Sequence, residues 1–93
     1  MDVKLYSTTY CGYCRSAKQL LAARGLPFTE IDCTNEPDVR ARLVEETGRR
    51  TVPQIYLDGV PIGGYDELRR LDRSGELARI AAGEARPSSV AGT

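Results

Sequence analysis

Two cysteines separated by two residues, Cys11 and Cys14, follow an apolar strand-like segment over residues 3–6 and stand at the start of a helical pattern. Residues three positions apart share one face of the first helical turn, so these two thiols can close a small disulfide ring. Unpaired backbone N–H groups and the positive end of the helix dipole favour an anion there, and we expect them to stabilise a thiolate at Cys11. Arg15 and Lys18 add positive charge nearby. The pattern predicts a redox-active dithiol.

A Cys-x-x-Cys pair can also form half of a zinc site, which needs two further cysteine or histidine ligands. The chain has no histidine and only one other cysteine, Cys33, so the ligand count argues against zinc. An odd number of cysteines also argues against a framework of structural disulfides and favours a reducing compartment, which we take to be the cytoplasm. We interpret Cys33 as a small buried or half-buried residue.

The composition limits the kind of protein further. Ninety-three residues make one small domain, and no apolar run approaches the ~20 residues that cross a bilayer. Thirteen basic and thirteen acidic residues cancel, and neither sign forms a long block, so we expect no nucleic-acid partner and no membrane partner. No apolar stretch with a small-residue cleavage site follows Met1, so we expect no export signal.

The first half of the chain predicts a strand–helix–strand unit followed by a second helix. Helical spacing predicts a helix over residues 12–24, and alternating polarity predicts a half-buried strand over residues 28–32. A unit of this length places its two strands parallel. Asn35 is the expected cap of the next helix, with Pro37 in its first turn and Gly48 at its end.

The second half predicts a hairpin and a helical end. Residues 52–57 and 60–62 flank the two-residue turn Asp58-Gly59, and Asp66 opens an amphipathic helix that is broken at Gly75 before a last short helix. We expect the domain to span residues 1–83. Residues 84–93 lack periodic apolar positions, so we expect a disordered tail there.

Three separated motifs give the chain a resemblance to the glutaredoxins, in particular to bacterial-type dithiol glutaredoxins. They are the Cys-Gly-Tyr-Cys of residues 11–14, the Thr-Val-Pro of residues 51–53, and the Gly-Gly-Tyr-Asp of residues 63–66. The resemblance covers about residues 3–82. It implies an α/β protein of the thioredoxin-like fold, with a four-stranded mixed sheet in the order β-α-β-α-β-β-α and helices on its faces.

The resemblance also implies an activity. A glutaredoxin is a glutathione-dependent thiol–disulfide oxidoreductase, active in electron transport and cell redox homeostasis, which reduces glutathione mixed disulfides and protein disulfides. In this chain Cys11 would be the nucleophile that takes the glutathionyl group, and Cys14 would resolve the mixed disulfide when the substrate is a protein disulfide. The expected partners are glutathione and glutathionylated or disulfide-containing proteins, and the expected state is a monomer.

The glutathione site is implied by the same resemblance. A cis Val52-Pro53 bond would turn the Val52 backbone toward the cysteinyl unit of glutathione, which it would pair as a strand does. Backbone N–H groups near Tyr65 and Asp66 would bind the γ-glutamyl carboxylate, and Asp66 would accept from its ammonium group. The glutathione-binding residues implied in this way are Tyr13, Arg40, Thr51, Val52, Pro53, Gly64, Tyr65 and Asp66, with Arg40 at the glycyl carboxylate and Tyr13 stacked along the ligand.

Two positions depart from the commoner family pattern. Thr8 stands where many relatives carry a lysine that contacts the glycyl carboxylate and the thiolate. Gly12 replaces a proline, and glycine at this position also occurs in relatives that share a [2Fe–2S] cluster between two subunits and two glutathiones. A cluster carrier using Cys11 is therefore the alternative hypothesis. Mycoredoxins, which use a different small thiol, can also carry Cys-Gly-Tyr-Cys, but residues 63–66 favour glutathione.

Overall fold

The computed structural model describes residues 1–89. Its elements in chain order are β1 (Val3–Ser7), α1 (Gly12–Ala23), β2 (Thr29–Asp32), α2 (Pro37–Thr47), β3 (Gln54–Leu57), β4 (Val60–Gly63), α3 (Tyr65–Arg73) and α4 (Glu76–Ala81). This is the predicted order, with the last helical region divided in two at Gly75 as the sequence indicated.

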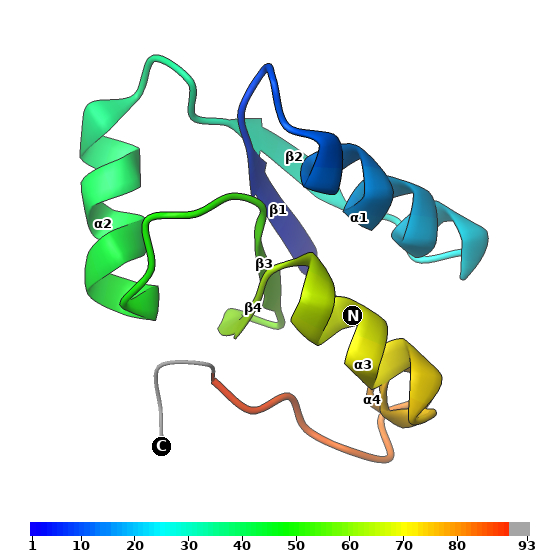
Figure 1. Cartoon of the computed structure of the whole chain (residues 1–93). Helices are drawn as coiled ribbons and strands as arrows, with labels where there is room; N and C mark the ends of the chain where they lie inside the picture. Colours follow the sequence, from blue (N-terminus) through cyan, green and yellow to red (C-terminus); the bar gives the residue numbers. More distant parts are fainter. Residues whose placement is uncertain (90–93) are drawn as a thin grey trace.

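The four strands form one mixed sheet in the order β2-β1-β3-β4. β1 runs parallel to β2, with Leu5 opposite Glu30, and antiparallel to β3, with Leu5 opposite Ile55. β3 and β4 form an antiparallel hairpin. The predicted fold class, a thioredoxin-like four-stranded mixed sheet flanked by helices, is confirmed (Figure 1).

Alternation along the strands divides the core between the two faces of the sheet. Leu5, Ile55 and Leu57 belong to the larger cluster, which also takes in buried residues of α1, α3 and α4. Tyr56, from the same strand, belongs instead to a smaller cluster with Leu43 of α2. Accordingly, α1 and α3 lie on one side of the sheet and α2 on the other (Figure 1). This arrangement brings the starts of α1 and α3 to the same end of the sheet.

The ends of α2 differ in part from the prediction. The N-cap residue is Glu36 and not Asn35, and its side chain makes no capping hydrogen bond. Pro37 at the first helical position fixes the backbone for helix entry without a side-chain cap, which makes an asparagine cap unnecessary. Gly48 ends the helix in the left-handed conformation, with φ of 72°, as expected.

The hairpin follows the sequence signals, whereas the second strand is shorter than the predicted residues 28–32 and more exposed than the predicted half-buried strand. Asp58 and Gly59 both have positive φ, 50° and 81°, which is the backbone of a tight two-residue turn between antiparallel strands. β2 is mainly exposed, with Ile31 half-buried, because it occupies the edge of the sheet.

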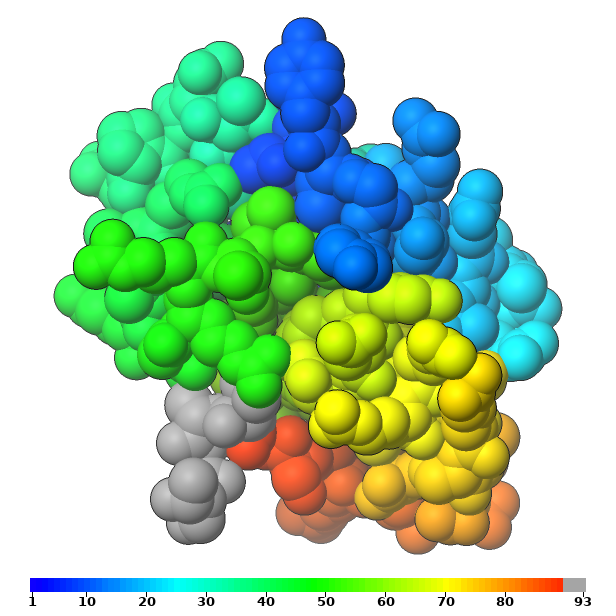
Figure 2. Space-filling model, viewed as in Figure 1, coloured from blue at the N-terminus to red at the C-terminus, as the bar shows by residue number. Residues whose placement is uncertain are grey.

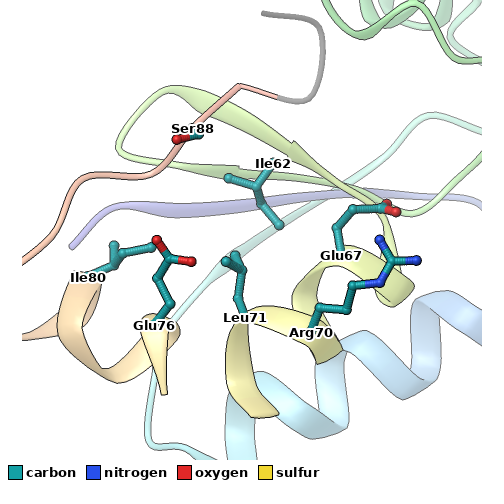
Figure 3. A pocket seen from close by; sticks show the side chains of 7 residues that line it. All are labelled: Ile62, Glu67, Arg70, Leu71, Glu76, Ile80 and Ser88. Carbon is teal, nitrogen blue, oxygen red and sulfur yellow. The ribbon is translucent and has the colours of Figure 1, made fainter. Parts of the chain in front are cut away.

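Beyond α4 the chain turns back over the larger core cluster. Residues 84–89 form neither helix nor strand, and Ala85 packs against that cluster. Ser88 lines a pocket of about 250 Å³ together with Ile62, Leu71 and Ile80 (Figure 3). The predicted disordered tail covers residues 84–93, and its last four residues lie outside the described part of the chain. Within residues 1–89, every helix is too short or too polar to cross a membrane.

Candidate active site around Cys11 and Cys14

Cys11 is the N-cap residue of α1. Its backbone is extended, with φ of −140° and ψ of 106°, and its sulfur accepts a hydrogen bond from the backbone N–H of Cys14 over 3.1 Å. The sulfur thus takes the place of the serine or aspartate oxygen that commonly caps a helix. Because Cys11 is half-buried while the other two cysteines are buried, it is the thiol that a substrate can reach.

Cys14 occupies a different environment one helical turn later. Its side chain is 2% exposed, and burial together with the hydrogen bond to Cys11 raises the pKa of Cys14 to about 12. The Cys14 thiol is therefore protonated at neutral pH, and it cannot compete with Cys11 as a nucleophile. Burial therefore distinguishes Cys14 from Cys11, the N-cap residue of the same helix.

A cavity of about 360 Å³ borders Cys11 on the side of α1 and the loop before it. Arg15 and Lys18, the two cations predicted near Cys11, both line it, and so does Thr8. The Lys18 ammonium is engaged by Glu30 at 2.9 Å. Arg15 is exposed and belongs to none of the ion pairs found within residues 1–89.

On its other side, Cys11 faces the loop before β3. The Val52-Pro53 peptide bond is cis, as the resemblance implied. The carbonyl oxygen of Val52 lies 3.5 Å from the Cys11 sulfur, within reach of the thiol hydrogen. The backbone expected to pair with a peptide-like ligand is therefore in contact with the expected nucleophile.

A second cavity, of about 250 Å³, brings together most of the residues that the sequence singled out. Its lining includes Tyr13, Thr51, Val52, Pro53, Gly64, Tyr65 and Asp66, together with Arg49 and Glu67. The rings of Tyr13 and Tyr65 stack with centroids 6.2 Å apart and planes 28° apart, which joins the start of α1 to the start of α3. Figure 2 shows the start of α1 (blue), the loop before β3 (green) and α3 (yellow) meeting on one face.

Arg40 does not line this cavity. Its guanidinium donates to the carbonyl oxygen of Arg50 over 3.0 Å, on the side where it borders a different pocket with residues of α2. The cation that does line the cavity is Arg49.

Arg49 and Glu67 were not predicted as site residues. Arg49 pairs with Glu67 at 2.7 Å, and the same carboxylate oxygen accepts from the backbone N–H of Gly64 over 2.7 Å. Burial opposes ionisation of this carboxyl, but the Gly64 N–H and Arg49 outweigh it and hold the pKa of Glu67 below its usual range. A glutamate three residues after a helix cap is the capping-box pattern, so the sequence contained a signal for this bond.

Gly63 and Gly64 allow this close packing. Gly63 has φ of 108°, and a side-chain carbon there would lie 2.5 Å from the Glu67 carboxylate. A side-chain carbon at Gly64 would lie 3.1 Å from the Pro53 carbonyl oxygen. The glycine pair is therefore required to bring the N-terminus of α3 against the loop before β3.

Gln54 is a further residue that sequence analysis missed. It is 1% exposed, and its Nε2 donates to the Thr51 carbonyl oxygen over 2.8 Å, which ties β3 to the loop that lines the cavity. Its Oε1 is the only buried side-chain nitrogen or oxygen without a hydrogen-bond partner in the described part of the chain. No sequence pattern distinguishes this glutamine from an exposed one, because its burial depends on the packing of α2 over the sheet.

Within residues 1–89, no three histidine, cysteine, aspartate or glutamate side chains are grouped closely enough to hold a metal ion. A single chain thus presents only Cys11 as an accessible thiol ligand.

Comparisons with known proteins agree with this geometry. A family model described as Glutaredoxin matches residues 3–62. A protein named Glutaredoxin from Pseudomonas aeruginosa is 45% identical over 75 residues, covering 81% of this chain and 89% of that protein. Glutaredoxin 3 of Escherichia coli K12 is 40% identical over 76 residues, covering 82% and 92%. The crystal structure of a buckwheat glutaredoxin–glutathione complex has a TM-score of 0.81 at 34% identity and covers 87% of this chain and 76% of that one.

Proposed function

The chain belongs to the glutaredoxin family, and from this we propose that Cys11 is the nucleophile with which it acts as a glutathione-dependent thiol–disulfide oxidoreductase. The protein is an enzyme, and glutathione is its reductant. The observation that best supports the role of Cys11 is its position as a half-buried helix cap whose sulfur accepts the Cys14 N–H, with the Cys14 thiol buried beneath it. The alternative of an iron–sulfur carrier is not favoured by the matches to known proteins.

Two exchanges complete the reaction on a glutathionylated substrate. The Cys11 thiolate attacks the glutathione sulfur of the mixed disulfide, which forms the Cys11–glutathione disulfide and releases the substrate as a thiolate. A second glutathione thiolate attacks the same glutathione sulfur, which releases glutathione disulfide and regenerates the Cys11 thiolate. The Cys14 N–H stabilises the Cys11 thiolate before the first step and after the second.

Cys14 has a part only when the substrate is a protein disulfide. Attack by Cys11 then links the two proteins, and the Cys14 thiol must lose its proton to displace the substrate and form the Cys11–Cys14 bond. Burial is the main cause of the raised pKa of Cys14, and the hydrogen bond and charge of the Cys11 sulfur raise this pKa further. Only this second contribution is removed when the Cys11 sulfur is bonded.

The glutathionyl group is assigned to the cavity between the starts of α1 and α3. The Val52 backbone would pair with its cysteinyl unit, next to the Cys11 sulfur. The N–H groups of Tyr65 and Asp66 lie in the first turn of α3, where a helix has no backbone acceptors for them, and would bind the γ-glutamyl carboxylate. The Asp66 carboxylate would accept from the ammonium group of the ligand.

Two arginines are assigned to the ligand carboxylates. Arg49 adds positive charge beside Gly64, at the γ-glutamyl end of the cavity. Arg40 is proposed for the glycyl carboxylate from the family pattern, and its guanidinium has N–H groups besides the one that donates to the Arg50 carbonyl. Replacing each with glutamine and comparing the KM for a glutathione mixed disulfide distinguishes the two roles.

We also propose the domain boundary, the cellular location, the oligomeric state and the protein substrates from the family membership. Residues 1–83 form the catalytic domain, and the protein acts as a cytoplasmic monomer on glutathionylated and disulfide-containing proteins. Size-exclusion chromatography of the reduced protein, with and without glutathione, tests the monomer.

The decisive experiment is reduction of a small glutathione mixed disulfide, coupled to glutathione reductase and NADPH. We expect turnover in the wild type, its loss by more than about a thousandfold in Cys11→Ser, and its retention in Cys14→Ser. Cys33→Ser is the matched control, since Cys33 is a buried thiol that lines neither cavity beside Cys11. Turnover retained in Cys11→Ser would refute the role of Cys11.

A further inference from the structure

Acidic side chains of α3 form ion pairs with other parts of the chain, whereas the arginines of α3 form none within residues 1–89. Glu67 pairs with Arg49, and Asp72 pairs with Arg24 through two hydrogen bonds of 2.6 and 2.8 Å. Two of the three acids of α3 are therefore paired with cations outside the helix, and the third, Asp66, belongs to no ion pair found within residues 1–89. The arginines of the same helix, Arg69, Arg70 and Arg73, are exposed, and none of them belongs to an ion pair found within residues 1–89. We call these three residues the α3 arginine face.

Two residues of the α3 arginine face, Arg70 and Arg73, lie in the last turn of α3, where positive charge interacts favourably with the helix dipole. Arg69 and Arg73 are four positions apart, so their like charges are neighbours on the helix surface and repel each other. No buried group accepts a hydrogen bond from either side chain within the described part of the chain. Because all three arginines are exposed, their positive charge is available to a negatively charged partner.

The position of this face relates it to the catalytic site. Its three arginines line one surface hollow together with Asp66, and Asp66 also lines the glutathione cavity. With three arginines and one aspartate, the lining of this hollow carries net positive charge. Arg70 stands at its margin, since it also lines the pocket that contains Glu67 and Leu71 (Figure 3). Figure 2 shows α3 in yellow directly beside the start of α1, so the helix that carries the α3 arginine face adjoins the segment that holds Cys11.

Aromatic side chains extend the same face on the side of α1. Tyr10 is 96% exposed and Tyr13 is 66% exposed, and they flank Cys11 in the sequence. Exposed tyrosines provide rigid contact area for a protein partner. Arg15, also exposed, adds a further unpaired cation beside the Cys11 cavity.

We propose that the α3 arginine face binds an acidic segment of the protein substrate, next to the cysteine that carries the glutathionyl group. This rests on the proposed function. The partner is a protein with aspartate or glutamate residues near its modified cysteine. Its glutathionyl group occupies the cavity lined by Asp66, and its backbone passes along α3. Complementary charge raises the rate of productive encounter, and it does so most at low ionic strength.

The chemical step is the exchange described above. The peptide–glutathione disulfide breaks, the Cys11–glutathione disulfide forms, and the peptide leaves as a thiolate, so no further oxidant or reductant is needed. The arginine face touches none of the reacting atoms. Its effect is therefore expected in kcat/KM for acidic substrates and not in the chemistry of small ones.

The test compares three synthetic peptides, each with one glutathionylated cysteine flanked by glutamates, by serines or by lysines. The variant is Arg69→Gln/Arg73→Gln, which leaves Arg70 beside Glu67 unchanged. The matched control is Arg42→Gln/Arg86→Gln, which removes the same charge at exposed positions that line none of the cavities described above. Measurements are made at ionic strengths of about 0.01 M and about 0.15 M, where the Debye length is roughly 30 Å and 8 Å.

At the lower ionic strength we expect the wild type to prefer the acidic peptide to the lysine peptide by about tenfold in kcat/KM. The variant should lose about fivefold on the acidic peptide and little on the serine peptide, and the control should lose nothing. Equal rates for the three peptides, or equal losses in variant and control, would overturn the proposal. Failure of the proposed function would look different, because the wild type would then turn over none of the peptides.

Discussion

The backbone N–H of Cys14 points at the Cys11 sulfur over 3.1 Å, while the sulfur of Cys14 is itself buried. The backbone N–H of Cys14 therefore stabilises a thiolate at Cys11, while the thiol of Cys14 is itself inaccessible. The consequence is a division of reactivity between two cysteines that are three positions apart.

The difference in reactivity between Cys11 and Cys14 predicts that an alkylating reagent modifies Cys11 selectively. Iodoacetamide added to the reduced protein at about pH 7.5 should modify Cys11 alone, since iodoacetamide reacts with the thiolate form of cysteine. Burial raises the pKa of both Cys14 and Cys33, so these thiols should react only after denaturation. Peptide mass spectrometry of native and denatured samples provides the measurement. Modification of Cys14 before Cys11 in the native protein would contradict the assignment.

The lowered pKa of Glu67 leads us to expect that the protein loses stability in acid. Its folded-state pKa lies below the ordinary value of 4.5, so its ionised form stabilises the protein above that pH, and the contribution disappears as pH falls below it. We expect Glu67→Gln to lower stability by about 1 kcal/mol at neutral pH and to flatten the decline in Tm below about pH 4.5. Glu45→Gln, at an exposed position of α2, is the control. Parallel Tm curves for wild type and Glu67→Gln would exclude this role.

We expect the Gln54→Leu variant to fold but to bind glutathione poorly. Gln54→Leu removes the hydrogen bond to the Thr51 carbonyl and also removes the unpartnered Oε1, so the two effects on stability oppose each other. We expect Tm to change by only a few degrees, while the KM for a glutathione mixed disulfide rises by about five- to tenfold because the Thr51–Pro53 loop is less well held. A variant with unchanged KM would show that the loop holds its position without Gln54.

Truncation after Gly83 tests the proposed domain boundary. Ala85 packs on the core, so removing residues 84–93 should lower the free energy of unfolding by about 0.5–1 kcal/mol. Turnover of a small mixed disulfide should be unchanged, because none of the removed residues 84–89 lines the cavities beside Cys11. Chemical denaturation and the coupled assay measure the two quantities. Loss of turnover in a folded truncated protein would move the boundary toward the C-terminus.

The sequence by itself determined the elements and the chemistry. Periodicity, the Asp58-Gly59 turn and the glycine stops gave the strands and helices to within a few residues, because these signals act between neighbours in the chain. The Cys-x-x-Cys spacing and its place at a helix start predicted Cys11 as the nucleophile for the same reason, and this role stays a prediction. Asn35 is not the N-cap residue of α2, because Pro37 fixes the backbone at the start of the helix without a side-chain cap.

Tertiary structure decided which side chains meet. Arg40 lies in the first turn of α2 and Arg49 follows Gly48 at its end, but only the packed structure shows that Arg40 donates to the Arg50 carbonyl while Arg49 lines the cavity against Glu67. Burial of Gln54 and the contrast between Cys11 and Cys14 also arise only when helices cover the sheet. Exposure, desolvation and long-range pairing depend on elements distant in sequence, so they follow from packing and not from the order of residues.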